Sequence, residues 1–337
     1  MAHVMAGAPA GGAELFFERL TAALYGAGED VLPVIRRNPT RAARLAGKGL
    51  HPVQLGFGGA LDLLTRPRLS AVLRRFAPGV VVAWMNRAAR LTPRGGWVLA
   101  GRLGGYYDLK YYRRCDHLIG NTRGIVEWIA GQGWPAARVH HLPNFAPDLL
   151  GTAPALLPSP PGAPVVLALG RLHRNKAFDI LVRALPLLPG VHAVVAGEGP
   201  ERAALLALAR QEGVADRFHL LGWRTDQAAL LAAAGVLACP SRHEPLGNVV
   251  IEAFSAGCPV VAADAAGPVE LIADGVTGLL APREDPRRLA DALGGVLADA
   301  ALSTRLAAAG RACYLIDHAP APVLHRWRDT LTRLEPA

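Results

Sequence analysis

The chain has 337 residues, 51% of them hydrophobic, so it is long enough for two domains with buried cores. Its four cysteines match neither a zinc pattern nor a disulfide framework, and no apolar run of about 18 residues predicts a membrane span. The net charge is +9, and the positive excess lies in residues 1–150. That excess suggests an acidic partner, such as anionic lipid, a phosphorylated glycan or nucleic acid, but an arginine-rich solvated surface explains it equally well.

Apolar stretches alternate with amphipathic ones through the first half of the chain. This pattern predicts helices at 13–25 and 124–131 and strands at 3–5, 30–35, 80–84, 97–100, 117–120 and 138–142. The first residues lack the positive charge and long apolar stretch of a signal peptide. We therefore expect a cytoplasmic location.

Two glycines, Gly11 and Gly12, lie between the first predicted strand and the first predicted helix. Backbone without side chains lets N–H groups approach a phosphate or a sugar closely. A purely structural turn explains the two glycines about as well.

Residues 61–76 mix apolar residues with four arginines, and Pro67 interrupts them. An ordinary half-buried helix is the simpler interpretation, while a basic surface segment that contacts anionic lipid is the alternative.

A proline-rich stretch at 151–164 divides the chain. We therefore expect one domain over 1–150, a second over 151–318, and a helix over 319–337 that packs back on the first. After the division, the pattern predicts strands at 165–169, 191–196, 218–222, 236–240 and 259–264, with helices at 178–188, 201–211, 227–234 and from about 248. Short apolar strands alternating with helices indicate two Rossmann-like α/β domains with parallel sheets.

Polar residues gather where these later strands end, which is the edge at which open α/β sheets bind ligands. Arg171 and Lys176 share the loop after strand 165–169, where an arginine fork and a lysine could grip a diphosphate. Glu244 and Glu252 lie on either side of Leu246-Gly247-Asn248, and carboxylates accept hydrogen bonds from sugar hydroxyls. The helix that begins near Asn248 also offers free backbone N–H groups to an anion.

Trp223 follows the strand 218–222 at the same edge of the sheet. It could stack on a nucleobase, or it could equally cap the core. The chain contains no Asp-x-Asp sequence and no histidines at metal-ligand spacing, so no metal site and no cofactor is expected.

With these residues assembled, the chain resembles the retaining glycosyltransferases of family 4, whose fold is GT-B, two Rossmann-like domains facing across a cleft. The motifs that carry the resemblance are G-G-A-E and H-L-P-N-F in the first half and G-R-L-H-R-N-K, G-E-G-P, L-G-W, E-P-L-G-N-V-V-I-E-A, A-G-C-P-V-V and D-G-V-T-G-L-L in the second. The stretch R-L-G-G-Y-Y-D-L-K-Y-Y looks like bacterial lipopolysaccharide-core members.

The resemblance implies a role for each matching position. Arg171 and Lys176 would bind the donor diphosphate, and Glu244 would contact the transferred sugar. Glu252 would bind the ribose, and Gly12 would lie under the diphosphate. Leu246, Gly247 and Asn248 would offer backbone contacts to the sugar and the phosphate.

One position departs from the family. Many members carry a histidine near the end of a strand in the first domain, and the comparable stretch here, 100–104, has none. Arg102, or Asn86 and Arg87 on the previous strand end, could fill that space.

The sequence therefore predicts a metal-independent glycosyltransferase that moves a sugar from a nucleotide-sugar to a glycan or lipid-linked acceptor with retention, in lipopolysaccharide or other cell-envelope glycan synthesis. A nucleotide-sugar epimerase of the same architecture and a non-catalytic binding subunit are the alternatives. No nucleic-acid recognition motif is present. Peripheral attachment to the inner face of an anionic membrane is the preferred use of the basic first half.

Overall fold

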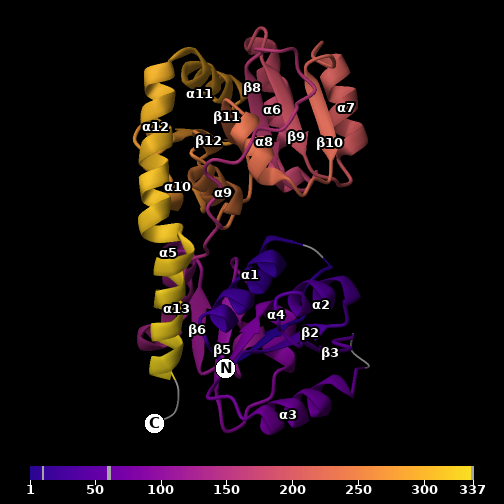
Figure 1. The fold of residues 1–337 in the computed structure, drawn as a ribbon, viewed down its shortest axis with the longest axis vertical. Helices are drawn as coiled ribbons and strands as arrows, with labels where there is room; N and C mark the ends of the chain where they lie inside the picture. Colours follow the sequence, from indigo (N-terminus) through magenta and orange to yellow (C-terminus); the bar gives the residue numbers. More distant parts are fainter. Residues whose placement is uncertain (10, 59–61, 335–337) are drawn as a thin grey trace. The chain divides into compact units, whose positions relative to one another are not determined.

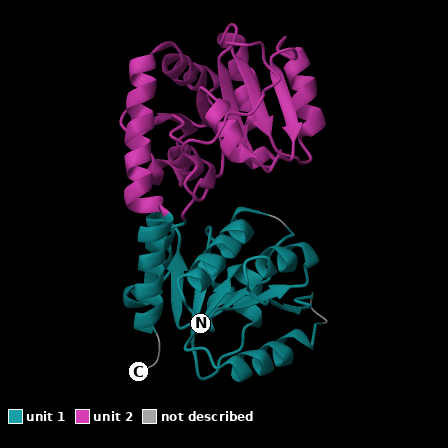
Figure 2. Cartoon of the chain, in the orientation of Figure 1, with its two compact units in different colours: residues 1–144, 320–337 teal, residues 145–319 magenta. Residues whose placement is uncertain are grey.

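The computed structural model describes residues 1–9, 11–58 and 62–334. The chain forms two compact units, unit 1 made of Met1–Asn144 with Pro320–Ala337 and unit 2 made of Phe145–Ala319 (Figure 2). The first boundary thus lies at residue 144, ahead of the proline-rich stretch 151–164, which belongs to unit 2. The C-terminal helix belongs to unit 1.

Unit 1 contains a seven-stranded sheet among its described residues, and every neighbouring pair of strands is parallel. In spatial order the strands are β3 (Val53–Leu55), β2 (Leu32–Arg36), β1 (Ala2–Met5), β4 (Val80–Trp84), β5 (Val98–Leu103), β6 (His117–Gly120) and β7 (Val139–His141). The chain starts in the middle and builds outward in both directions (Figure 1), so the direction of building changes between β1 and β4.

The helices of unit 1 cover both faces of its sheet because successive strand side chains point to opposite sides. One apolar cluster contains Val4, Leu69 and Ile125, whereas Phe16 lies in an aromatic group with Trp84 and Trp327. The helical segments are α1 (Gly12–Gly26), α2 (Pro39–Ala46), α3 (Thr65–Phe76), α4 (Met85–Leu91), η1 (Leu109–Tyr112), α5 (Arg123–Gly131), η2 (Ala136–Arg138) and α13 (Pro320–Leu334).

The last helix is fixed to unit 1 by tryptophan. The Trp327 ring stacks on Trp84 with centroids 6.2 Å apart, and its Nε1 donates to the carbonyl of Pro143 at 3.3 Å. Both tryptophans are fully buried, and buried aromatic side chains contribute large apolar areas to a core. Helix α13 is therefore part of the core of unit 1.

Unit 2 repeats the parallel plan with six strands among its described residues. The spatial order is β10 (Phe218–Gly222), β9 (His192–Ala196), β8 (Val165–Leu169), β11 (Val236–Cys239), β12 (Val260–Ala263) and β13 (Leu279–Ala281). Here the direction of building changes between β8 and β11.

Alternate residues of β8 enter separate cores. Val166 and Ala168 pack in one cluster, and Leu167 and Leu169 pack in the other. This alternation explains why the strand is apolar throughout. The helical segments on the two faces are α6 (Phe178–Ala184), η4 (Leu185–Leu187), α7 (Arg202–Gln211), α8 (Gln227–Ala233), α9 (Asn248–Ala256), α10 (Pro268–Leu271), α11 (Pro286–Ala298) and α12 (Ala300–Cys313), with η3 (Arg174–Lys176) before α6 and the π-helix η5 (Tyr314–His318) after α12.

Short-range signals set several helix ends. Asn38 and Thr122 accept a hydrogen bond from a backbone N–H three residues on, which begins α2 and α5. Gly257, with φ of +68°, ends α9 in the left-handed conformation that glycine adopts without strain.

The predicted α/β class with two Rossmann-like parallel sheets is confirmed. The three-residue strands β3 and β13 were not predicted, and the segment predicted at 61–76 is helical from Thr65. In the described part of the chain, no single helix is long and apolar enough to cross a membrane. One sharply bent pair, Pro286–Ala298 with Ala300–Leu334, passes by length and composition alone.

Candidate active site

The polar residues predicted in unit 2 lie around the point where its strand order reverses. Strands β8 and β11 are neighbours, and the chain leaves their carboxyl ends into two different loops. Ligands of open α/β sheets bind in the crevice at such a point. The first loop carries Arg171 and Lys176, and the second carries Glu244.

Lys176 and Glu244 form an ion pair across these two loops. Their side chains are only 24% and 11% exposed, and the Ser241 hydroxyl donates to the same Glu244 oxygen at 3.3 Å. Burial alone would lower the pKa of Lys176, but the charge of Glu244 outweighs it, so the pKa is raised. Lys176 therefore keeps its positive charge at neutral pH.

Arg171 is an exposed cation on the same loop. Its side chain makes no hydrogen bond or ion pair with any residue that the structure describes. Gly170 before it has φ of +145°, which suits glycine, and this turns the chain out of β8. The guanidinium group is thus available to a ligand such as a diphosphate.

Two glycines of the loop after β9 pack directly on this basic loop. A Cβ added at Gly197 would lie 1.8 Å from the carbonyl oxygen of Gly170, and one at Gly199 would lie 2.3 Å from that of Leu172. The backbone N–H of Leu172 also donates to the carbonyl of Glu198 at 2.9 Å. The G-E-G sequence is therefore required by the close approach of two loops.

Arg242 ties the two functional loops together, and it is not among the residues predicted from the sequence. Its guanidinium group forms two hydrogen bonds to Asp179, at 2.8 and 2.6 Å, and one to the carbonyl of Arg174 at 2.9 Å. Its backbone N–H donates to Asn175 O at 2.8 Å. Arg242 thereby fixes the position of Glu244 relative to Lys176. Its neighbours in S-R-H-E were visible in the sequence, but Asp179 and Arg174 lie more than 60 residues away, and Glu284, which accepts from its Nε at 2.8 Å, lies 42 residues away.

The Leu246-Gly247-Asn248 turn lies at the start of α9. Gly247 has φ of +96°, and Leu246 is buried. A Cβ at Gly267 would lie 2.2 Å from the Leu246 carbonyl oxygen, so the loop after β12 packs tightly under this turn. The turn therefore lies on the ligand side of the sheet, and its backbone contacts to the sugar and the phosphate remain a prediction.

Glu252 and Trp223 occupy contrasting environments. Glu252 is 7% exposed on α9, whereas Trp223 is 58% exposed after β10. Exposure removes the interpretation of Trp223 as a core cap and leaves its indole ring open to stack on a base. The ribose contact of Glu252 remains a prediction.

In unit 1 the glycine-rich loop lies after β1, also where the strand order reverses. The loop folds around Glu14, whose Oε1 accepts from the N–H of Ala8 at 2.7 Å. A Cβ at Gly7 or Gly11 would lie 2.2 or 2.4 Å from a Glu14 carboxylate oxygen. Gly12 is exposed at the first turn of α1, where a backbone contact to an anion is sterically open.

Arg102 lies in the interior of unit 1. Its side chain is 1% exposed, its guanidinium carbon lies 4.8 Å from the centre of the Trp84 ring, and its Nη2 donates to Asn144 Oδ1 at 2.7 Å. Burial lowers its pKa to about 10. Its Nε is buried without a hydrogen-bond partner among the described residues, and the substrate contact of Arg102 remains a prediction.

Asn86 is a further candidate to replace the missing histidine. It follows β4, and its Oδ1 is buried without a hydrogen-bond partner among the described residues. Met85 beside it has φ of +62°, and strain of this kind in a residue other than glycine is often found at functional sites. Arg87 is exposed and donates to Phe57 O at 3.4 Å.

Comparison with known proteins gives the class. Residues 163–299 match the sequence pattern of the family described as glycosyl transferases group 1. Over 308 residues the chain is 36% identical to the lipopolysaccharide core biosynthesis glycosyltransferase LpsE of Rhizobium meliloti (strain 1021), with 89% of each chain covered. The chain therefore belongs to the group 1 glycosyltransferases, and it is a glycosyltransferase.

Further similarities agree with this assignment. LpsD of the same organism, also a lipopolysaccharide core biosynthesis glycosyltransferase, is 33% identical over 307 residues, which cover 89% of each chain. The crystal structure of Anabaena Alr3699/HepE in complex with UDP has a TM-score of 0.85 at 22% identity and covers 99% of this chain and 100% of that one. WaaG, a glycosyltransferase involved in lipopolysaccharide biosynthesis, has a TM-score of 0.74 at 18% identity, with 98% and 100% covered. The expected GT-B fold is confirmed.

Proposed function

We propose that this glycosyltransferase takes its sugar from a nucleotide-sugar held by unit 2 and transfers it, with retention of anomeric configuration and without a metal ion, to a glycan or lipid-linked acceptor held by unit 1. The observation that carries the donor assignment is the Lys176–Glu244 pair beside the unpaired Arg171 at the strand-order reversal of unit 2. A carboxylate that can accept from sugar hydroxyls thus lies beside cations that can bind a diphosphate.

Lys176, Arg171 and Glu244 also suggest how the protein assists the reaction. As the bond from the anomeric carbon to the diphosphate oxygen breaks, negative charge grows on the diphosphate. Lys176 and Arg171 would stabilise that charge, and such preorganised groups act most strongly in a site that excludes water. Glu244 would orient the sugar, and the leaving diphosphate would accept the acceptor's proton on the same face of the ring.

The proposal that the reaction needs no metal ion rests on the two cations Lys176 and Arg171. Among the described residues, no three His, Cys, Asp or Glu side chains gather as ligands for a metal ion. Lys176 and Arg171 would supply the positive charge that a divalent ion supplies in other phosphate chemistry.

On the acceptor side we assign Asn86 to the space of the family's histidine. Its buried, unpartnered Oδ1 could accept a hydrogen bond from a substrate hydroxyl, which would remove the cost of leaving that oxygen unpaired. The lipopolysaccharide-core relatives favour an acceptor of that kind, a growing cell-envelope glycan. UDP-sugars are the first donors to test, because the structurally similar Alr3699/HepE binds UDP.

A second feature of unit 1 favours attachment to an anionic membrane. Leu63 and Leu64 are 81% and 59% exposed immediately before α3, whose arginines at 66, 68, 74 and 75 are all exposed. Apolar side chains beside a basic helix face bind to lipid interfaces.

In vesicle sedimentation, replacing both Leu63 and Leu64 by serine should weaken binding to anionic lipid, whereas Leu156→Ser, at a 99% exposed position of unit 2, should not. Equal binding by all three proteins would remove the membrane proposal.

The transfer itself is tested by product analysis. The protein is incubated with a panel of nucleotide-sugars and a deacylated lipopolysaccharide-core acceptor, and the anomeric configuration of the new linkage is read by NMR. We expect transfer with the donor's configuration retained. An inverted linkage would refute retention, and conversion of the donor sugar alone, with no nucleotide released, would support the epimerase alternative.

A further inference from the structure

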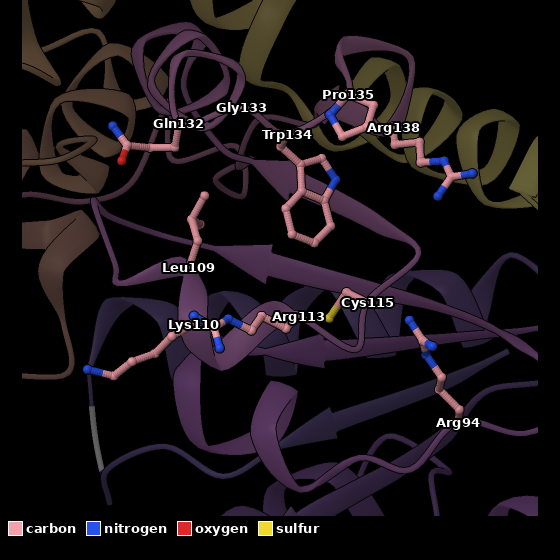
Figure 3. A pocket seen from close by; sticks show the side chains of 10 residues that line it. All are labelled: Arg94, Leu109, Lys110, Arg113, Cys115, Gln132, Gly133, Trp134, Pro135 and Arg138. Atoms are coloured by element: carbon pink, nitrogen blue, oxygen red, sulfur yellow. The ribbon is translucent and has the colours of Figure 1, made fainter.

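A second concave site lies in unit 1, away from the ligand edge of its sheet. Arg94 precedes β5, Cys115 precedes β6 and Arg138 precedes β7, and all three line one cavity of about 410 Å³ (Figure 3). The cavity is therefore at the amino ends of these strands. Ligands of open α/β sheets bind at the opposite, carboxyl ends, so this cavity is separate from the acceptor side proposed above.

The cavity is lined by cations and by no carboxylate. The four cations are Arg94, Lys110, Arg113 and Arg138. Two of them are engaged, because Lys110 pairs with Asp108 at 2.6 Å and Arg94 donates to the carbonyl of Arg114 at 2.9 Å. The guanidinium groups of Arg113 and Arg138 form no hydrogen bond or ion pair within the described ranges. The cavity thus keeps an excess of positive charge, with the Asp108 carboxylate paired to Lys110 and also within electrostatic reach of Arg113.

Trp134 supplies an aromatic wall and an unused donor. Helix α5 ends at Gly131, and Gly133 two residues on has φ of +87°, which turns the chain so that the indole ring of Trp134 projects into the cavity (Figure 3). The Trp134 Nε1–H is buried and has no acceptor among the described residues. A buried donor left unpaired is costly, so a ligand oxygen that accepted from it would gain stability.

The other residues that line the cavity are compatible with an anionic ligand that packs on the Trp134 ring. Burial, with the nearby Asp116, raises the pKa of the Cys115 thiol to about 12, so it adds no negative charge at neutral pH. Leu109 and Pro135 extend the apolar wall beside Trp134. A ligand that fits must therefore be anionic at one end and carry a compact group with an apolar face at the other.

We propose that this cavity binds a phosphate ester of a sugar or of glycerol. Arg113 and Arg138 lie on either side of Trp134 (Figure 3), so one of the two would bind the phosphate oxygens by charge-assisted hydrogen bonds while the other adds attraction by its charge, and the attached group would pack on the Trp134 ring. The same chemistry occurs in a phospholipid headgroup and in a free phosphorylated sugar or glycerol. The site would hold the enzyme on a phosphate-bearing partner without taking part in transfer.

The test follows the tryptophan indole N–H signals by NMR while glycerol 3-phosphate is added to the full chain. Trp134→Phe identifies the Trp134 signal. We expect that signal to shift with saturation in wild type. The double variant Arg113→Gln/Arg138→Gln should bind about ten-fold more weakly or worse, because hydrogen bonds to charged groups are lost.

The matched control is Arg210→Gln/Arg287→Gln, which removes the same charge from exposed positions of unit 2. Equal weakening in both double variants, or no shift of the Trp134 signal, would overturn the proposal. Vesicles with and without phosphatidylglycerol identify the source. Binding of vesicles that depends on Arg113 and Arg138 assigns the site to a headgroup, and binding of glycerol 3-phosphate alone assigns it to a free ester. The readout is independent of sugar transfer, so its failure would leave the proposed activity untouched.

Discussion

Lys176 and Glu244 form an ion pair in a mostly buried position. Removal of either side chain therefore leaves an unpaired charge there. Lys176→Met leaves the Glu244 carboxylate without its cation and removes a positive charge from the proposed leaving group. We predict that Lys176→Met and Glu244→Gln each lower kcat/KM by roughly 10²-fold, the scale seen when one electrostatic stabiliser of a transition state is removed. Steady-state kinetics measures these values. In the double variant, the fold reduction in kcat/KM should be far smaller than the product of the two single reductions.

Arg242 acts through the loops that it ties together, so its removal should affect geometry more than charge at the substrate. For Arg242→Ala we predict that kcat falls by about ten-fold, because small displacements of catalytic groups are costly. Arg242→Lys should recover little, since a lysine cannot reproduce the paired hydrogen bonds to Asp179. An unchanged kcat in Arg242→Ala, with the protein folded, would show that the loops keep their positions without it.

At the scale of elements, the loops after β8 and β9 pack against each other without room for a side chain at Gly197. Gly197→Ala places a Cβ 1.8 Å from the Gly170 carbonyl oxygen, so a backbone shift is unavoidable. We predict a loss of about 2 kcal/mol in the free energy of unfolding, measured with urea. Gly295→Ala is the control, because that Cβ meets nothing within 4 Å on α11, and it should stabilise the helix by up to about 1 kcal/mol.

Much of this architecture could be predicted from the sequence because the strands are short and fully buried. Strands β4, β6, β8 and β10 match their predicted ranges, since an apolar run ended by glycine or a polar residue is a local signal. Strands β3 and β13 have three residues each and were missed, whereas β7, of the same length, falls within the predicted range 138–142, so such short strands are found from the sequence only in some cases.

Part of the candidate site could also be predicted, because local sequence patterns mark the strand ends on which its residues lie. Arg171, Lys176 and Glu244 are marked by their place after apolar strands, and parallel topology brings those strand ends to one edge. The role of Arg242 depends on Asp179 and Arg174, whose proximity no local pattern encodes. The burial of Arg102 against Trp84 was likewise not predictable from its position at a strand end.

For the whole molecule, several histidines make stability depend on pH. Burial lowers the pKa of His3 to about 3, and burial also lowers the pKa values of His117, His140 and His219 from the ordinary 6.5. The unfolded chain therefore binds more protons than the folded one below pH 6.5. The contribution of these histidines to the free energy of unfolding is therefore fully present above pH 6.5 and is lost as the pH falls below that value.

We predict that His3 alone removes about 1.4 kcal/mol of stability between pH 7.5 and 5.5. Urea unfolding at the two pH values measures this, and His3→Gln should reduce the difference even if it lowers stability at both. His51→Gln, at an exposed histidine, is the control. A difference in His3→Gln equal to that of wild type would contradict the assignment.

The most direct test of the donor site is acceptor-free release of nucleotide diphosphate from a panel of UDP-sugars. We predict slow release by wild type and by Arg210→Gln, and release roughly 10²-fold slower by Lys176→Met and Glu244→Gln. Equal release by all four proteins would show that the Lys176–Glu244 pair does not hold the reacting sugar nucleotide, and it would contradict the account.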